Sequence, residues 1–207
     1  DAGDLSGQYL LSRGRRTLDI LVLTHLHSDH ADGVPQLLEY VRVKTLILPE
    51  PGPDDAELHD RILSAAMQHG TDVRYVYEDG LVELEDIELR LYAPREAGGS
   101  NERCVCVRLS AGDYDCMISA DSPMSREREL VRNYELSETE LLIVGHHGSK
   151  YSSSPEYLSA LGGETAVISC GYNSYGHPTQ EVLERLLDYG YNILRTDMVS
   201  TVEIRIR

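Results

Sequence analysis

The chain has 207 residues, 41% of them apolar and 26% charged, which fits one globular domain and argues against disordered and fibrous classes. It carries 35 acidic residues against 19 basic ones, a formal net charge of −16. This balance argues against a general nucleic-acid coat protein, but not against an enzyme with local positive charge or bound metal. No stretch has the roughly 18 continuous apolar residues of a membrane helix, and no signal peptide is visible, so we expect a soluble chain.

Strand and helix patterns alternate at both ends of the chain, with strands alone in the middle. The first part predicts a buried strand at 19–24, a helix at 34–42, a strand at 43–49 and an amphipathic helix at 54–70. Strand patterns then follow at 72–77, 81–84, 87–94, 103–110 and 114–120. The last part predicts helices at 125–134, 154–162 and 178–190, and strands at 139–145, 164–170, 191–196 and 199–207. No linker or repeat divides the chain, so we expect one α/β domain over 1–207 with helices packed outside sheets.

Three histidines and an aspartate directly follow the first buried strand, in the sequence HLHSDH. In an extended segment His25 and His27 point the same way and can hold one ion. After a turn, Asp29 and His30 can face a second ion a few Å away. Imidazole and carboxylate ligands together suit Zn, Mn or Fe, so this cluster predicts a metal centre.

Other strands also end in residues that can bind metal. Asp121 ends the strand at 114–120, and His146 and His147 follow the strand at 139–145, with glycines on both sides. His177 lies in a loop ahead of a helix, whereas His59 and His69 have ordinary surface spacing on the helix at 54–70. A lone Asp at a strand end is usually a helix cap, but this convergence favours Asp121 as a bridge between two ions.

The segment THLHSDHADG resembles the HxHxDH signature of the metallo-β-lactamase superfamily, whose fold is an αββα sandwich with a two-metal site. The segments GHHGSKYSSSPEYLSAL and YGHPTQEVLERL resemble the C-terminal domain of ComEC-type DNA-internalisation competence proteins. The resemblance covers nearly the whole chain and implies the αββα fold without its first strands. It also implies that the chain is a soluble fragment of a larger membrane protein. The membrane channel domain of that polypeptide is then an expected partner, and the side of the membrane stays open.

By this resemblance, His25 and His27 hold the first metal, Asp29 and His30 hold the second, Asp121 bridges them and His147 completes the second. We expect Asp29 to be required for catalysis as well as for metal binding. Many members have a further histidine between the first cluster and the bridging Asp, but this chain has none between His69 and His146. A stretch near Asn101 stands in that place, and the first metal then has only three protein ligands. Zn or Mn are the expected ions.

These residues predict a metal-dependent phosphodiesterase, and the resemblance implies a nuclease that acts on DNA during competence-related uptake. His146 or His177 would protonate the leaving oxygen, since imidazole titrates near neutrality. Lys150, Ser149 and Asn101 would bind substrate, with Lys150 as a point charge for phosphate. The net charge of −16 predicts weak, salt-sensitive and sequence-blind binding, with a single strand favoured over a duplex.

Two other functions fit the same residues. A small phosphoester hydrolase, such as a phosphorylcholine esterase, would use the same metals with an aromatic cage for the ammonium group. The candidate cage residues are Tyr151, Tyr157, Tyr172 and Tyr175. A non-catalytic module with a vestigial metal site, which positions DNA at a channel, is the second alternative. Turnover of nucleic acid, of small phosphoesters only, or of neither distinguishes the three.

Overall fold

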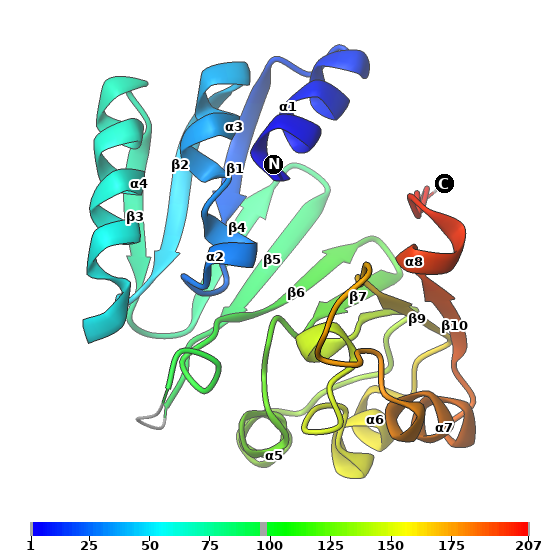
Figure 1. The fold of residues 1–207 in the computed structure, drawn as a ribbon. Coiled ribbons are helices and arrows are strands. Elements are labelled where there is room, and N and C mark those ends of the chain that lie inside the picture. Colours follow the sequence, from blue (N-terminus) through cyan, green and yellow to red (C-terminus); the bar gives the residue numbers. More distant parts are fainter. Residues whose placement is uncertain (1, 96–98, 207) are drawn as a thin grey trace.

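The structure is a computed structural model that describes residues 2–95 and 99–206. The first half of the chain is built on a three-stranded parallel sheet (Figure 1). Its strands lie in the order β1-β2-β3. The elements of this half are α1 Ala2–Ser12, β1 Thr17–Val22, α2 Ser28–Ala31, α3 Val34–Tyr40, β2 Arg42–Pro49, a 3₁₀ turn Pro53–Asp55, α4 Ala56–Gln68 and β3 Asp72–Val76. Helices α3 and α4 pack on this sheet. Their contact residues are Leu37, Leu38, Ile62 and Ala66, which cluster with Leu46 and Leu48 of β2.

The second half of the chain forms a seven-stranded sheet in the order β10-β9-β8-β7-β6-β5-β4. Strands β4 to β7 form antiparallel pairs, and β7 to β10 run parallel. Its strands are β4 Gly80–Leu84, β5 Ile87–Tyr92, β6 Cys106–Ala111, β7 Tyr114–Ile118, β8 Leu141–Ile143, β9 Thr165–Ile168 and β10 Asn192–Arg195. The helical elements between or after them are α5 Met124–Asn133, a 3₁₀ turn Gly145–Gly148, α6 Pro155–Leu161, α7 Gln180–Asp188 and α8 Thr196–Val199.

Three apolar clusters separate four layers, two of helices and two of sheet. Ile47 and Val76 of the small sheet meet Leu91, Val105 and Val107 of the large one in the middle cluster. The outer clusters join each sheet to its own helices, α1, α3 and α4 on one side and α5, α6 and α7 on the other (Figure 1). This arrangement confirms the predicted αββα sandwich.

The topology brings several strand ends to one place. Because β7, β8 and β9 are parallel neighbours, their carboxyl ends share one edge of the large sheet. The loop after β1 reaches the same region: Leu23 N donates to Ile47 O at 2.9 Å, and Val105 N donates to Thr24 O at 2.8 Å. The second of these bonds ties the end of the small sheet to the large one.

The predicted secondary structure is wrong at both ends of the chain. The sequence patterns indicated no helix over α1, whose Gly3 and Gly7 are poor helix formers but let it approach α3 closely: a Cβ on Gly7 would lie 2.6 Å from Tyr40 Cγ. The strand expected at 199–207 is absent from the described residues 199–206, where the chain turns at Ser200 and only Val202 packs on the large sheet. Alternating apolar residues without a neighbouring strand form no ladder.

None of the helices within residues 2–95 and 99–206 has the length and apolar character needed to span a membrane.

Candidate metal centre

The HLHSDH segment changes conformation in the middle, which separates its candidate metal ligands into two pairs. His27 is extended, with φ −65° and ψ 148°, and is followed directly by the helical turn α2, which carries Asp29 and His30. Thr24 Oγ1 lies 3.2 Å from His25 Nδ1, so this contact leaves Nε2 of His25 free to face the centre. The extended-then-turned backbone is the arrangement that the spacing predicts.

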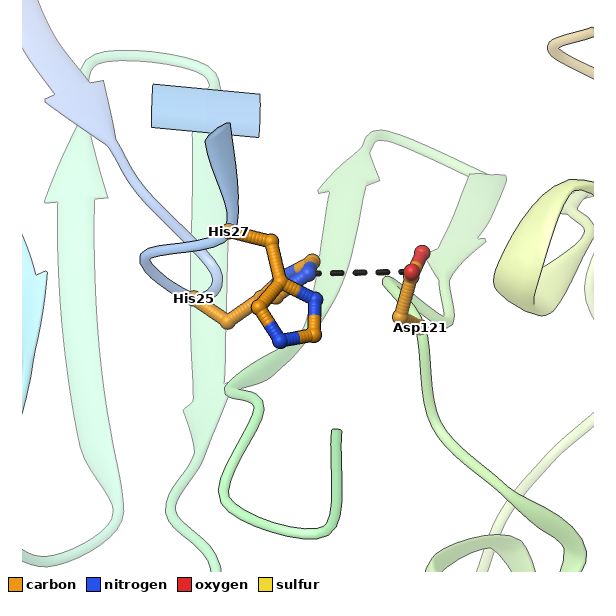
Figure 2. A group of neighbouring side chains, drawn as sticks. All are labelled: His25, His27 and Asp121. Atoms are coloured by element: carbon orange, nitrogen blue, oxygen red, sulfur yellow. Dashed lines mark ion pairs between the residues drawn. The ribbon is translucent and has the colours of Figure 1, made fainter. Parts of the chain in front are cut away.

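Asp121 enters the centre from a tight turn beyond β7. The preceding residue, Ala120, has φ 53°, a left-handed conformation that favours glycine. Ala120 O accepts a 2.9 Å hydrogen bond from His146 N, which joins this turn to the one beyond β8. The carboxylate of Asp121 is 5% exposed and faces the histidines of the first segment (Figure 2).

His146 and His147 lie in the 3₁₀ turn Gly145–Gly148 and not on an extended strand end. Both residues are left-handed, with φ 49° and 53°, yet their ring centroids still lie 6.5 Å apart. His147 Nδ1 lies 2.7 Å from the carbonyl oxygen of Ser169, at the end of β9. With the proton on Nδ1 donated to that carbonyl, His147 Nε2 is left free as a ligand.

His25, His27 and Asp121 form the first group of possible ligands. Each offers one ligand atom, and these atoms all lie within 4.8 Å of one another. The contact from His25 Nε2 to Asp121 Oδ2 is 3.7 Å, and both residues are buried (Figure 2). Two imidazoles and one carboxylate converge here from the two halves of the sandwich.

Asp29, His30 and His147 form the second group, with the same 4.8 Å limit. Asp29 Oδ2 lies 3.6 Å from His30 Nε2 and 3.3 Å from His147 Nε2. Asp121 Oδ1 lies 3.2 Å from His30 Nε2, while its other oxygen faces the first group. The carboxylate of Asp121 is therefore positioned between the two groups.

The donor atoms fit divalent metal ions. His25 Nε2 and His30 Nε2 are buried and make no hydrogen bond of good geometry in the described residues, although unpaired buried polar atoms are costly. Burial and the neighbouring His30 lower the pKa of His25 to about 4, which keeps its imidazole neutral, the form that binds metal. The nitrogen and carboxylate donors of both groups suit Zn or Mn.

The buried carboxylate in this centre is strongly held in its charged form. Burial opposes ionisation of Asp121, but the imidazoles of His30 and His25 outweigh it and lower its pKa to about 2. Burial likewise opposes charging of His30, but Asp121 raises the pKa of His30 above its ordinary value. These opposite shifts have one cause, the attraction between a buried carboxylate and adjacent imidazoles.

The other two predicted catalytic histidines lie beside these groups. His146 Nε2 is 3.8 Å from Asp121 Oδ2, and the ring centroids of His146 and His177 are 5.6 Å apart. Asn173 fixes His177 by bonding both its N–H and its C=O. Burial and the neighbouring His146 lower the pKa of His177. Thr179 N also donates to Gly148 O at 3.0 Å, which brings the His177 loop against the histidine turn.

The predicted substrate-binding residues are in different environments. Asn101 lines a hollow of about 470 Å³ together with His27 and His146, and its Oδ1 is buried without a hydrogen-bond partner in the described residues. Lys150 is exposed, and its Nζ lies 5.0 Å from the centroid of the Tyr151 ring. Ser149 is only 1% exposed, so the structure does not place its hydroxyl on the open surface of the site.

The loop after the histidine turn has buried support that the sequence patterns did not reveal. Both oxygens of Glu127, on α5, accept 2.6 Å hydrogen bonds, from the N–H groups of Ser153 and Ser154. Glu127 is fully buried, and burial raises its pKa to about 7 despite these donors. Arg185 donates to the carbonyl oxygens of Ser152 and Ser153. Nothing in this charge-rich helical segment distinguishes the buried Glu127 from the exposed Arg128 next to it.

Comparison with known proteins assigns the family. The family model described as Metallo-beta-lactamase superfamily matches residues 2–172. The chain belongs to the metallo-β-lactamase superfamily. Among solved structures of this fold, a variant of the β-hydroxylase CmlA has a TM-score of 0.58 at 14% identity, covering 87% of this chain and 43% of that one. Igni18, a metallo hydrolase from Ignicoccus hospitalis, has 0.52 at 14% identity, covering 86% and 76%.

Within the superfamily, the chain is similar to competence proteins of the ComEC type, as its motifs predicted. It is 29% identical over 200 residues to ComE operon protein 3 of Bacillus subtilis, covering 95% of this chain and 26% of that protein. It is 32% identical over 196 residues to competence protein ComA of Neisseria gonorrhoeae, covering 94% and 26%. The chain thus spans about a quarter of the length of these relatives.

Proposed function

We propose that this chain is a metal-dependent phosphodiesterase that hydrolyses DNA. The observation that carries the proposal is the position of Asp121, whose two oxygens face two separate groups of metal ligands. One group comprises His25, His27 and Asp121, and the other comprises Asp29, His30 and His147. Divalent ions in these groups would supply an activated water nucleophile and neutralise charge on the phosphoryl oxygens.

Other residues of this chain would donate the proton to the leaving group and bind the substrate. His146 and His177 lie next to the ligand groups without belonging to them, so either can give a proton to the leaving oxygen. Asn101 lines the hollow beside His146, where its side-chain amide is placed to contact the substrate. Lys150 adds an exposed positive charge on the adjacent loop for a phosphate.

Two features support a polymer as the substrate. The hollow beside the metal ligands adjoins a second one of about 660 Å³, and both are lined by His27, Gly99 and Ser100. Two of the curated relatives are named as a competence protein and a recombination protein, which supports a role in DNA uptake. We propose that the domain is part of a larger membrane protein of this type and acts beside its channel. The net charge of −16 favours weak, non-specific binding of one strand.

Measurement of bound metal should distinguish the roles of the adjacent His146 and His147. His147→Ala should lower the metal content, because it removes a nitrogen from the second group. His146→Ala should keep the metal and lower turnover by about 100-fold or more, the effect of losing a general acid. Elemental analysis of both purified variants measures this difference. Metal loss in His146→Ala with retention in His147→Ala would reverse the assignment.

Substrate comparison tests the proposed function. Rates would be measured for a single-stranded oligonucleotide, the matching duplex and bis(p-nitrophenyl) phosphate, with Mn²⁺ or Zn²⁺ present. We expect hydrolysis of the oligonucleotide, faster when it is single-stranded. Hydrolysis of the small ester alone would assign a small-phosphoester hydrolase instead. Full metal occupancy without turnover of any substrate would assign a non-catalytic DNA-positioning module.

A further inference from the structure

An exposed aromatic ring stands beside the metal ligands. The side chain of Tyr151 is 65% exposed and lines the 470 Å³ hollow that His27 and His146 also line. Tyr151 belongs to neither ligand group and makes no contact that the proposed chemistry requires. An exposed ring at the rim of a catalytic hollow is suited to contact the part of a substrate next to the reacting phosphate.

The backbone under this ring is held by hydrogen bonds to neighbouring elements. Tyr151 O accepts a 2.7 Å hydrogen bond from Met124 N, at the start of α5. The residues on the same loop, Ser149 and Ser152, are buried, and Ser152 Oγ bonds the carbonyl oxygens of Gly145 and Ser149 at 2.8 Å. Because the loop is already ordered, binding against Tyr151 costs little conformational entropy.

A positive charge next to the ring restricts what can bind there. Lys150 Nζ lies 5.0 Å from the centroid of the Tyr151 ring and makes no ion pair with any residue that the structure describes. This ammonium group repels a quaternary ammonium ligand but attracts a phosphate. Tyr157, another ring considered for an ammonium cage, is 1% exposed, with its hydroxyl 3.1 Å from Ser119 Oγ. At Tyr151 the charge disfavours a choline headgroup, and Tyr157 is too buried to contact one.

We propose that Tyr151 stacks on an unpaired nucleobase next to the scissile phosphate, while Lys150 contacts a flanking phosphate. This proposal rests on the proposed function and names its substrate class as single-stranded nucleic acid. Stacking suits an acidic protein, because it supplies affinity without requiring further positive surface. A base in a duplex has both faces covered by its neighbours, so it cannot stack on the ring without unstacking. Tyr151 is therefore a determinant of specificity for unpaired strands.

The test compares oligonucleotides with and without bases. Binding of labelled phosphorothioate octamers, one of thymidine and one of abasic sugars, would be measured by fluorescence anisotropy with Mn²⁺. The wild-type chain should bind the thymidine octamer at least about tenfold more tightly than the abasic one. Tyr151→Ala should reduce this preference about tenfold, and Tyr151→Phe should keep it within about twofold. The matched control is Tyr77→Ala, which removes a 67% exposed tyrosine beyond the end of β3.

The inference would be overturned if Tyr151→Ala kept the wild-type preference for the thymidine octamer over the abasic one. It would also be overturned if Tyr151→Phe lost this preference as fully as Tyr151→Ala, because the effect would then belong to the hydroxyl. Equal, Tyr151-dependent binding of a duplex octamer would also overturn it. A preference that depends on Tyr151, in a chain that hydrolyses no phosphodiester, would support the binding site and contradict only the proposed catalysis. Hydrolysis of DNA without a Tyr151-dependent preference for the thymidine octamer would support the proposed catalysis and contradict the stacking site.

Discussion

Asp121→Asn should lower the turnover of a phosphodiester by more than about 100-fold, beyond the loss typical of residues that only support a ligand. The carboxylate lies 3.7 Å from His25 Nε2 through one oxygen and 3.2 Å from His30 Nε2 through the other. An amide offers one neutral oxygen in place of two charged ones, so both ligand groups are weakened together. Because Asn has nearly the same shape, the fold should persist.

The matched control for this variant is Asp113→Asn. Asp113 is exposed in the turn before β7, whereas Asp121 follows the other end of the same strand. The control should keep wild-type turnover and metal content. Kinetics and elemental analysis on both variants measure the effect. Wild-type turnover in Asp121→Asn, with metal at saturating concentration, would contradict the role of this carboxylate.

Glu127→Ala should destabilise the fold by about 3 kcal/mol, because it leaves the N–H groups of Ser153 and Ser154 buried without acceptors. For a chain of this size, such a loss lowers Tm by roughly 6–12 °C. The loop that these bonds hold begins directly after the histidine turn, so metal affinity should also fall, by about 10- to 100-fold. Calorimetry and metal titration measure the two effects.

Arg128→Ala provides the comparison on the same helix. Arg128 is exposed and lies 3.4 Å from Glu156, a surface ion pair worth at most about 1 kcal/mol. Its replacement should leave both Tm and metal affinity nearly unchanged. If Glu127→Ala melted at the wild-type temperature and bound metal normally, the buried carboxylate would have no part in holding the ligand loop.

Most of the fold could be predicted because its strands are apolar runs bounded by polar residues. The patterns at 43–49 and 164–170 correspond to β2 and β9, within a few residues at each end. The failures occur where tertiary contacts decide. Helix α1 depends on its glycines fitting against α3, and the residues after α8 lack a strand to pair with.

The family resemblance implied the grouping of the site residues, and the spacing within HLHSDH also pairs His25 with His27 and Asp29 with His30. Residues beyond the carboxyl ends of parallel strands lie along one edge, so Asp121 and His147 could be expected close together. The left-handed backbone of the histidine turn, the burial of Ser149 and the support from Glu127 could not be predicted. Each of these depends on how loops pack, and side-chain periodicity carries no information about that.

The most direct test is a titration of the metal-stripped chain with Mn²⁺, measuring the initial rate of hydrolysis of a labelled single-stranded oligonucleotide. The two ligand groups around Asp121 predict no cleavage without metal and a rate that reaches its plateau at two ions per chain. Cleavage that is unaffected by removing the metal would contradict the account. So would the absence of cleavage when two ions per chain are bound.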